Sequence, residues 1–113
     1  LFLAGTDPYE IAKMAADRVA HVHLKDLTAE SAERVRRGEI AFRRAVIDGM
    51  FTPLGSGDVD IAGVIRTLEA AGYRGWYVLE QDRALAAEPG PGTGPLADAV
   101  TSVQYLERLA AEL

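Results

Sequence analysis

Two stretches of the sequence carry side chains that could bind a metal ion. The first, residues 20–27, holds two histidines and a lysine at alternate positions, and the second, residues 76–82, carries a glutamate near its end. Imidazole and carboxylate groups are common ligands of Mn, Co, Zn and Mg. We therefore take His23 and Glu80 as the candidate metal ligands.

These residue types also have simpler roles. His23 could be a hydrogen-bonded histidine of the core, and Glu80 could form an ion pair with Lys25. His21 lies one step earlier on the same face as His23, so we expect it deeper in the structure. There it would either support a metal ligand or be a buried histidine with its hydrogen bonds satisfied.

Lys25 stands at the end of the first stretch, where it could contact substrate by holding an oxygen or polarising a carbonyl. An ion pair with Asp26, Glu80 or Asp82 is an equally good interpretation. Asp26 points to the face opposite Lys25. We expect it to orient the following loop or to support the metal-binding histidine from behind.

The alternation of residue types indicates that both stretches are β-strands, because successive side chains of a strand point to opposite faces. The first stretch separates an apolar from a polar set, namely Val22 and Leu24 from His21, His23 and Lys25. The second separates Tyr77 and Leu79 from Trp76, Val78 and Glu80. Such strands suit a barrel that is covered by helices outside and has a polar cavity inside.

The segments around these strands have helical spacing. We expect a helix after Asp7, a helix between Asp60 and Gly72, and a last helix over residues 96–113. The core stripe of that last helix would consist of Val100, Val103, Leu106 and Leu109. Because a helix joins the two strands, they should be parallel.

Residues 28–50 form a charged excursion, which we interpret as one or two helices broken near Gly38. A solvated amphipathic helix is its simplest role, and a lid over the strand ends or a subunit contact is the alternative. Residues 51–60 should be a loop, and residues 86–95, rich in Gly and Pro, another. The Gly55-Ser56-Gly57 run could bind phosphate, but the acidic residues behind it favour a plain turn.

Composition narrows the function classes. The chain has 113 residues, which suffice for one modest domain, and its net charge of −5 counts against a nucleic-acid partner. Cysteine is absent, which excludes thiolate metal sites. No apolar run approaches the roughly 20 residues of a membrane span, so we expect a cytoplasmic protein without a membrane partner. Two strands cannot close a barrel, so we expect a part of a larger fold.

Three motifs resemble the xylose-isomerase-like TIM barrels of sugar isomerases and epimerases, and among these the inosose dehydratases of inositol catabolism in particular. Residues 35–51 also resemble a helical insertion of those dehydratases. The motifs are residues 21–26 (HVHLKD), 55–60 (GSGDVD) and 72–82 (GYRGWYVLEQD).

The resemblance implies a (β/α)8 barrel, of which residues 1–113 would be the C-terminal part within a single domain. The family binds a divalent metal through a Glu, an Asp, a His and a Glu. The last two match His23 and Glu80, and the first two would precede Leu1. The implied parent is a metal-dependent lyase or isomerase that acts next to the ketone of a sugar or cyclitol, and a homo-oligomer of that parent is an expectation.

Alternatives to dehydration remain at this stage. A ketose isomerase or epimerase of the same superfamily is one, although epimerases carry an arginine where this chain has residues 27–29 (LTA). A metal-dependent endonuclease for abasic DNA shares the barrel but needs more histidines and a basic groove. With half of the metal ligands, this chain alone should be inactive, so a non-catalytic piece is the third alternative.

Overall fold

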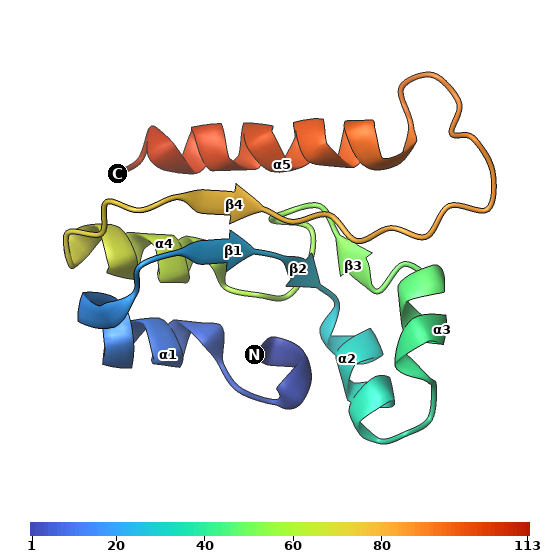
Figure 1. Cartoon of the computed structure of the whole chain (residues 1–113), viewed down its shortest axis with the longest axis horizontal. Coiled ribbons are helices and arrows are strands. Elements are labelled where there is room, and N and C mark those ends of the chain that lie inside the picture. The colour runs from blue at the N-terminus through green and yellow to red at the C-terminus, as the bar shows by residue number, and fades with distance from the viewer.

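The computed structural model describes residues 1–113, which form short strands surrounded by helices (Figure 1). The strands pair in two separate two-stranded sheets, β1 with β4 and β2 with β3. In chain order the elements are the single-turn 3₁₀ helix η1 (Phe2–Ala4), α1 (Pro8–Ala15), the 3₁₀ helix η2 (Ala16–Arg18), β1 (Val22–Leu24), β2 (Asp26–Leu27), α2 (Ala29–Arg36), α3 (Phe42–Ile47), β3 (Phe51–Thr52), α4 (Ile61–Ala70), β4 (Tyr77–Leu79) and α5 (Gly94–Ala110).

The parallel pair β1–β4 confirms the predicted arrangement of the two site strands. In its register, His23 lies opposite Val78 and Leu24 opposite Leu79. The pairing continues past β4, because the Glu80 N–H donates to the carbonyl of Leu24 at 3.0 Å. The carboxyl ends of both strands therefore lie at the same edge, which is where barrel enzymes keep their reactive side chains.

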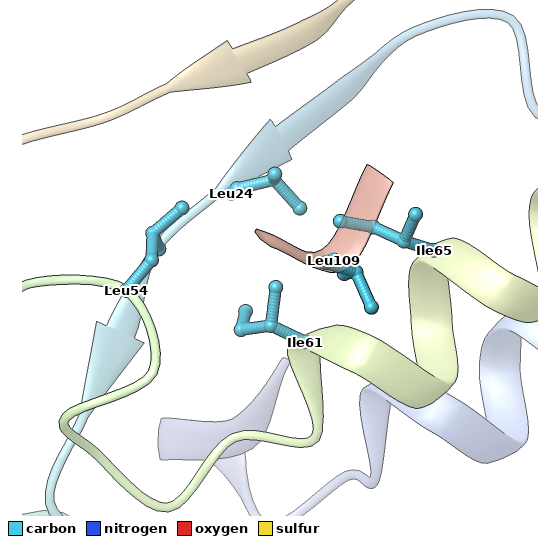
Figure 2. Close-up of a cluster of buried hydrophobic side chains, with 5 residues drawn as sticks. All are labelled: Leu24, Leu54, Ile61, Ile65 and Leu109. Carbon is cyan, nitrogen blue, oxygen red and sulfur yellow. The ribbon is translucent and has the colours of Figure 1, made fainter. Parts of the chain in front are cut away.

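The apolar face of the pair is covered by α4 and α5. Leu24 of β1 packs in one buried cluster with Ile61 and Ile65 of α4, Leu109 of α5 and Leu54 of the preceding loop (Figure 2). The spacing of Ile61, Ile65 and Leu68 places all three on the buried face of α4. This packing leaves the opposite face of β1 to the polar side chains.

A short antiparallel pair corrects the expectation that residues 51–60 are all loop. Asp26 of β2 pairs with Thr52 of β3, and Leu27 with Phe51. After α2 and α3 the chain returns to the side of β2, where the Thr28 N–H donates to the Met50 carbonyl at 3.2 Å. Two extended segments held side by side then form ladder hydrogen bonds.

The insertion and the helix ends agree with the sequence. Two helices, α2 and α3, are separated around Gly38, whose φ of 70° is readily adopted only by glycine. Asp7 and Asp60 cap α1 and α4 by accepting from the N–H groups of Tyr9 and Gly63. Gly72, with φ of 82°, follows the end of α4.

The predicted core stripe of α5 is half wrong. Leu109 is buried, whereas Val100 and Val103 are 48% and 46% exposed. The buried face instead carries Ser102, whose hydroxyl accepts from the Leu54 N–H at 3.0 Å and donates to the Asp98 carbonyl at 2.9 Å. This polar contact sets the rotation of the helix, so the valines face outward.

The buried core is small for a chain of this length. Only 15 of 113 residues are buried, and Trp76, Met14 and Leu96 are each at least 75% exposed. Each strand of the β1–β4 pair has one partner, so both outer edges of this sheet are free. No helix combines the length and hydrophobicity required to cross a membrane.

Free strand edges next to exposed apolar side chains promote association. We expect the purified chain to self-associate increasingly as its concentration rises, as measured by sedimentation velocity. Replacement of Trp76 with Ser should reduce this association, because it removes the most exposed of the large side chains. A single monomer boundary at every concentration would show that the chain needs no partner surface.

Candidate metal centre

His23 and Glu80 lie together at the ends of adjacent parallel strands. His23 Nδ1 is 3.4 Å from Glu80 Oε2, and both side chains are partly exposed to solvent. Two ligands of one ion, with bonds of about 2.1 Å, are separated by about 3.0–3.4 Å in octahedral or tetrahedral geometry. The separation therefore fits two ligands of one ion, while metal binding by this pair stays a prediction. No group of three or more acidic, histidine or cysteine side chains suited to a metal ion occurs in the chain.

Lys25 bridges two carboxylates beside this pair. Its Nζ lies 2.6 Å from Glu80 Oε1 and 2.6 Å from Asp82 Oδ2. Two of the three ion pairs that the sequence left open for Lys25 are thus formed, and the one with Asp26 is not. The ammonium also lies 4.8 Å from the centre of the Phe51 ring, within the range of a cation–π contact.

The pKa values of the pair reflect these contacts. Partial burial lowers the pKa of Lys25, but the hydrogen bonds to Asp82 and then to Glu80 outweigh it, so the pKa is raised above its ordinary value. The same ammonium, which donates to Oε1, holds the pKa of Glu80 below its ordinary value. Lys25 is therefore cationic and Glu80 anionic at neutral pH, the charge state that a metal-ligating carboxylate needs.

His21 does not lie where the sequence predicted. It is exposed rather than buried, and its side chain makes no hydrogen bond. Its ring centroid is 5.2 Å from that of His23, with the ring planes tilted by 57°. His21 lies just before β1, which begins only at Val22, and it lines an open hollow together with residues of η1 and α1.

Asp26 is the most deeply buried polar residue of the chain, with 0% exposure. Its Oδ1 accepts from the N–H groups of Leu27 and Val59, and its Oδ2 accepts from those of Gly55 and Gly57. The prediction that Asp26 orients a loop is confirmed, because it holds residues 55–59 in place. It makes no hydrogen bond to His23 or Glu80, so the alternative role behind the metal ligand has no contact to support it.

The Gly55-Ser56-Gly57 run is a turn around Asp26 rather than a phosphate-binding loop. The N–H groups that a phosphate would need already bind the carboxylate of Asp26. A Cβ at Gly57 would lie 2.3 Å from Asp26 Oδ1, so the close approach requires glycine there. The run is a turn that encloses the carboxylate of Asp26, which lies far upstream in the sequence.

The contact of Phe51 with Lys25 had no signal in the sequence. The two residues are far apart along the chain and meet because β3 pairs beside the end of β1. Phe51 in turn meets Phe42 of α3 edge to face, with ring centroids 6.3 Å apart. The helical insertion is thereby connected to the polar cluster through two aromatic rings.

Comparisons with known proteins identify the family of the chain. The sequence profile of the xylose isomerase-like TIM barrel family matches residues 1–109. An inosose dehydratase of Geobacillus kaustophilus is 38% identical over 111 residues, which are 96% of this chain and 34% of that protein. An inosose dehydratase of Geobacillus thermodenitrificans is 42% identical over 88 residues, 76% of this chain and 30% of that protein.

A third similar protein has a different name. The rhizopine catabolism protein MocC of Rhizobium meliloti is 37% identical over 109 residues, 96% of this chain and 32% of that protein. The chain thus spans about a third of the length of the curated relatives it matches.

The Asp26 network gives a prediction about stability. Each oxygen of the Asp26 carboxylate accepts two hydrogen bonds. In Asp26→Asn one of these oxygens is replaced by an NH₂ group, so two backbone N–H donors lose their acceptor. We expect the free energy of unfolding to fall by about 2–6 kcal/mol, since each of the two buried unpaired donors costs about 1–3 kcal/mol. Urea denaturation measures it, with the exposed Asp17→Asn as the matched control, for which a change within about 0.5 kcal/mol is expected. Equal stability of both variants would mean that the network does not hold the loop.

Proposed function

We propose that this chain, which belongs to the xylose isomerase-like TIM barrel family, supplies His23 and Glu80 to a divalent-metal centre. The centre would belong to an enzyme that acts on a sugar or polyol ketone. The observation that carries this proposal is the 3.4 Å between His23 Nδ1 and Glu80 Oε2. These atoms lie at the carboxyl ends of adjacent parallel strands, the place where barrel enzymes position reactive groups.

The residues have distinct roles in this proposal. His23 in its neutral form offers a ring nitrogen, and Glu80 offers Oε2, for Mn, Co, Mg or Zn. Such an ion, when bound, polarises a ketone oxygen and stabilises the charge that develops when the neighbouring carbon loses its proton. Lys25 has three N–H donors and uses two for carboxylates. The third is available to a hydroxyl or carbonyl oxygen of the substrate.

The relatives support a lyase that dehydrates a cyclic polyol ketone. Two of the proteins described above are named inosose dehydratase. In that reaction the carbon next to the ketone gives up a proton and an adjacent carbon loses its hydroxyl, so that water leaves and a double bond forms. The group that takes the proton lies outside the cluster of His23, Lys25, Glu80 and Asp82. A ketose isomerase or epimerase, which returns the proton instead, is the second candidate.

The reaction is tested with a protein of the full length of the relatives that carries this segment. We expect metal-dependent dehydration of 2-keto-myo-inositol and slower or no conversion of ketohexoses, followed by chromatography of the products. The 113-residue chain alone should convert neither, because it offers two metal ligands. Isomerisation of ketohexoses without dehydration would favour the second candidate, and turnover of neither substrate with metal supplied would remove both.

Metal binding is tested by calorimetry with Mn²⁺ in the same full-length protein. His23→Ala and Glu80→Gln should each weaken binding at least about tenfold, because each removes one ligand from a shared ion. The matched control is Glu30→Gln on α2, which should bind as the unaltered protein does. Unchanged affinity in both His23→Ala and Glu80→Gln would overturn the assignment.

A further inference from the structure

We propose that Lys25 and Asp82 are positioning residues that determine which oxygen of Glu80 faces the metal ion. Lys25 holds Oε1, so Oε2 remains for an ion beside His23, and Asp82 keeps Lys25 in place while offsetting its charge. This inference rests on the proposed metal centre and extends it to two residues that do not themselves bind the ion.

The contacts divide the two oxygens of Glu80 between different partners. Oε1 lies 2.6 Å from Lys25 Nζ, and Oε2 lies 3.4 Å from His23 Nδ1. A carboxylate whose one oxygen is held by an ammonium has lost the rotation that would exchange its two oxygens. Glu80 therefore presents a single, fixed oxygen and coordinates through that atom alone. The same side chain without Lys25 could turn and use either oxygen or both.

Charge explains why Asp82 is needed. A lysine beside a metal ligand repels a cation, which opposes binding. Asp82 Oδ2 lies 2.6 Å from the same ammonium, so one positive charge is matched by Asp82 and the negative charge of Glu80 is left for the ion. With His23 neutral, two carboxylates and one ammonium leave the cluster with a net charge of −1. Lys25 therefore keeps its hydrogen bond to Glu80 Oε1, while Asp82 offsets the repulsion between the ammonium and a metal cation.

The surroundings of Lys25 restrict its movement. Its side chain is 25% exposed, the least of the four residues of the cluster. The Phe51 ring covers the ammonium at 4.8 Å, and Phe42 of α3 packs against the edge of Phe51. The insertion therefore supports the polar cluster from the side, in addition to presenting charged residues to solvent.

A charge-matched double variant, Lys25→Met with Asp82→Asn, tests the proposal in a protein of the full length of the relatives that carries this segment. It removes one positive and one negative charge, so the net charge of the cluster stays the same while the hydrogen bond to Oε1 is lost. Mn²⁺ titration is followed by paramagnetic broadening of the His23 ring signals, which reports even weak binding at this place. The matched control is Arg44→Met with Asp48→Asn, which removes an exposed ion pair of the insertion.

We expect the double variant to need about tenfold more Mn²⁺ for half-maximal broadening, the loss typical of one hydrogen bond to a charged group. The Glu80 carboxylate should also become mobile in side-chain ¹³C relaxation, before any metal is added, while the amide signals of β1 and β4 keep their positions. The control variant should match the unaltered protein in both measurements. The loss should persist at high salt, because screening weakens charge effects and the net charge is unchanged.

An affinity for Mn²⁺ equal to or greater than that of the unaltered protein, with Glu80 equally ordered, would overturn the positioning role. Displaced amide signals of β1 and β4 would also count against it, since the pair would then be needed for the fold. Failure of the metal centre itself looks different, because the His23 signals of the unaltered protein would then not broaden selectively at all.

Discussion

The parallel hydrogen bonds between β1 and β4 are the constraint on which the site depends. They set a register in which His23 lies opposite Val78, and therefore place Glu80, two residues further along the same face, beside the histidine ring. A shift by one residue would turn Glu80 to the face of Tyr77 and Leu79, toward the helices. The distance between the two candidate ligands is thus a consequence of strand register before it is a property of either side chain.

The face opposite the site maintains that register. Leu24 is buried among residues of α4, α5 and the loop before α4, so β1 cannot slide without exposing it. Asp26 then ties the end of the strand to residues 55–59 through four N–H donors. The segment that carries His23 and Lys25 is therefore held by an apolar contact at Leu24, the last residue of β1, and by the buried carboxylate of Asp26.

Strand alternation and helix periodicity sufficed to predict the parts of the molecule that depend on local order. They gave the faces of β1 and β4, the caps at Asp7 and Asp60, and the meeting of His23 with Glu80. These patterns did not predict features that depend on a contact between residues far apart in the sequence. The rotation of α5 depends on the hydrogen bond between Ser102 and the Leu54 N–H, and β3 forms because the insertion returns beside β2. The exposure of His21 depends on what lies over the polar face, which no pattern within residues 20–27 reveals.

The most direct test of the account is to locate the ion. Crystals of a full-length protein carrying this segment, soaked in Mn²⁺, would be measured by anomalous diffraction at the manganese edge. The account predicts one anomalous peak about 2.0–2.3 Å from both a His23 ring nitrogen and Glu80 Oε2, with Lys25 still hydrogen-bonded to Oε1. A well-occupied peak elsewhere in the barrel, with His23 and Glu80 bonded to each other, would contradict it.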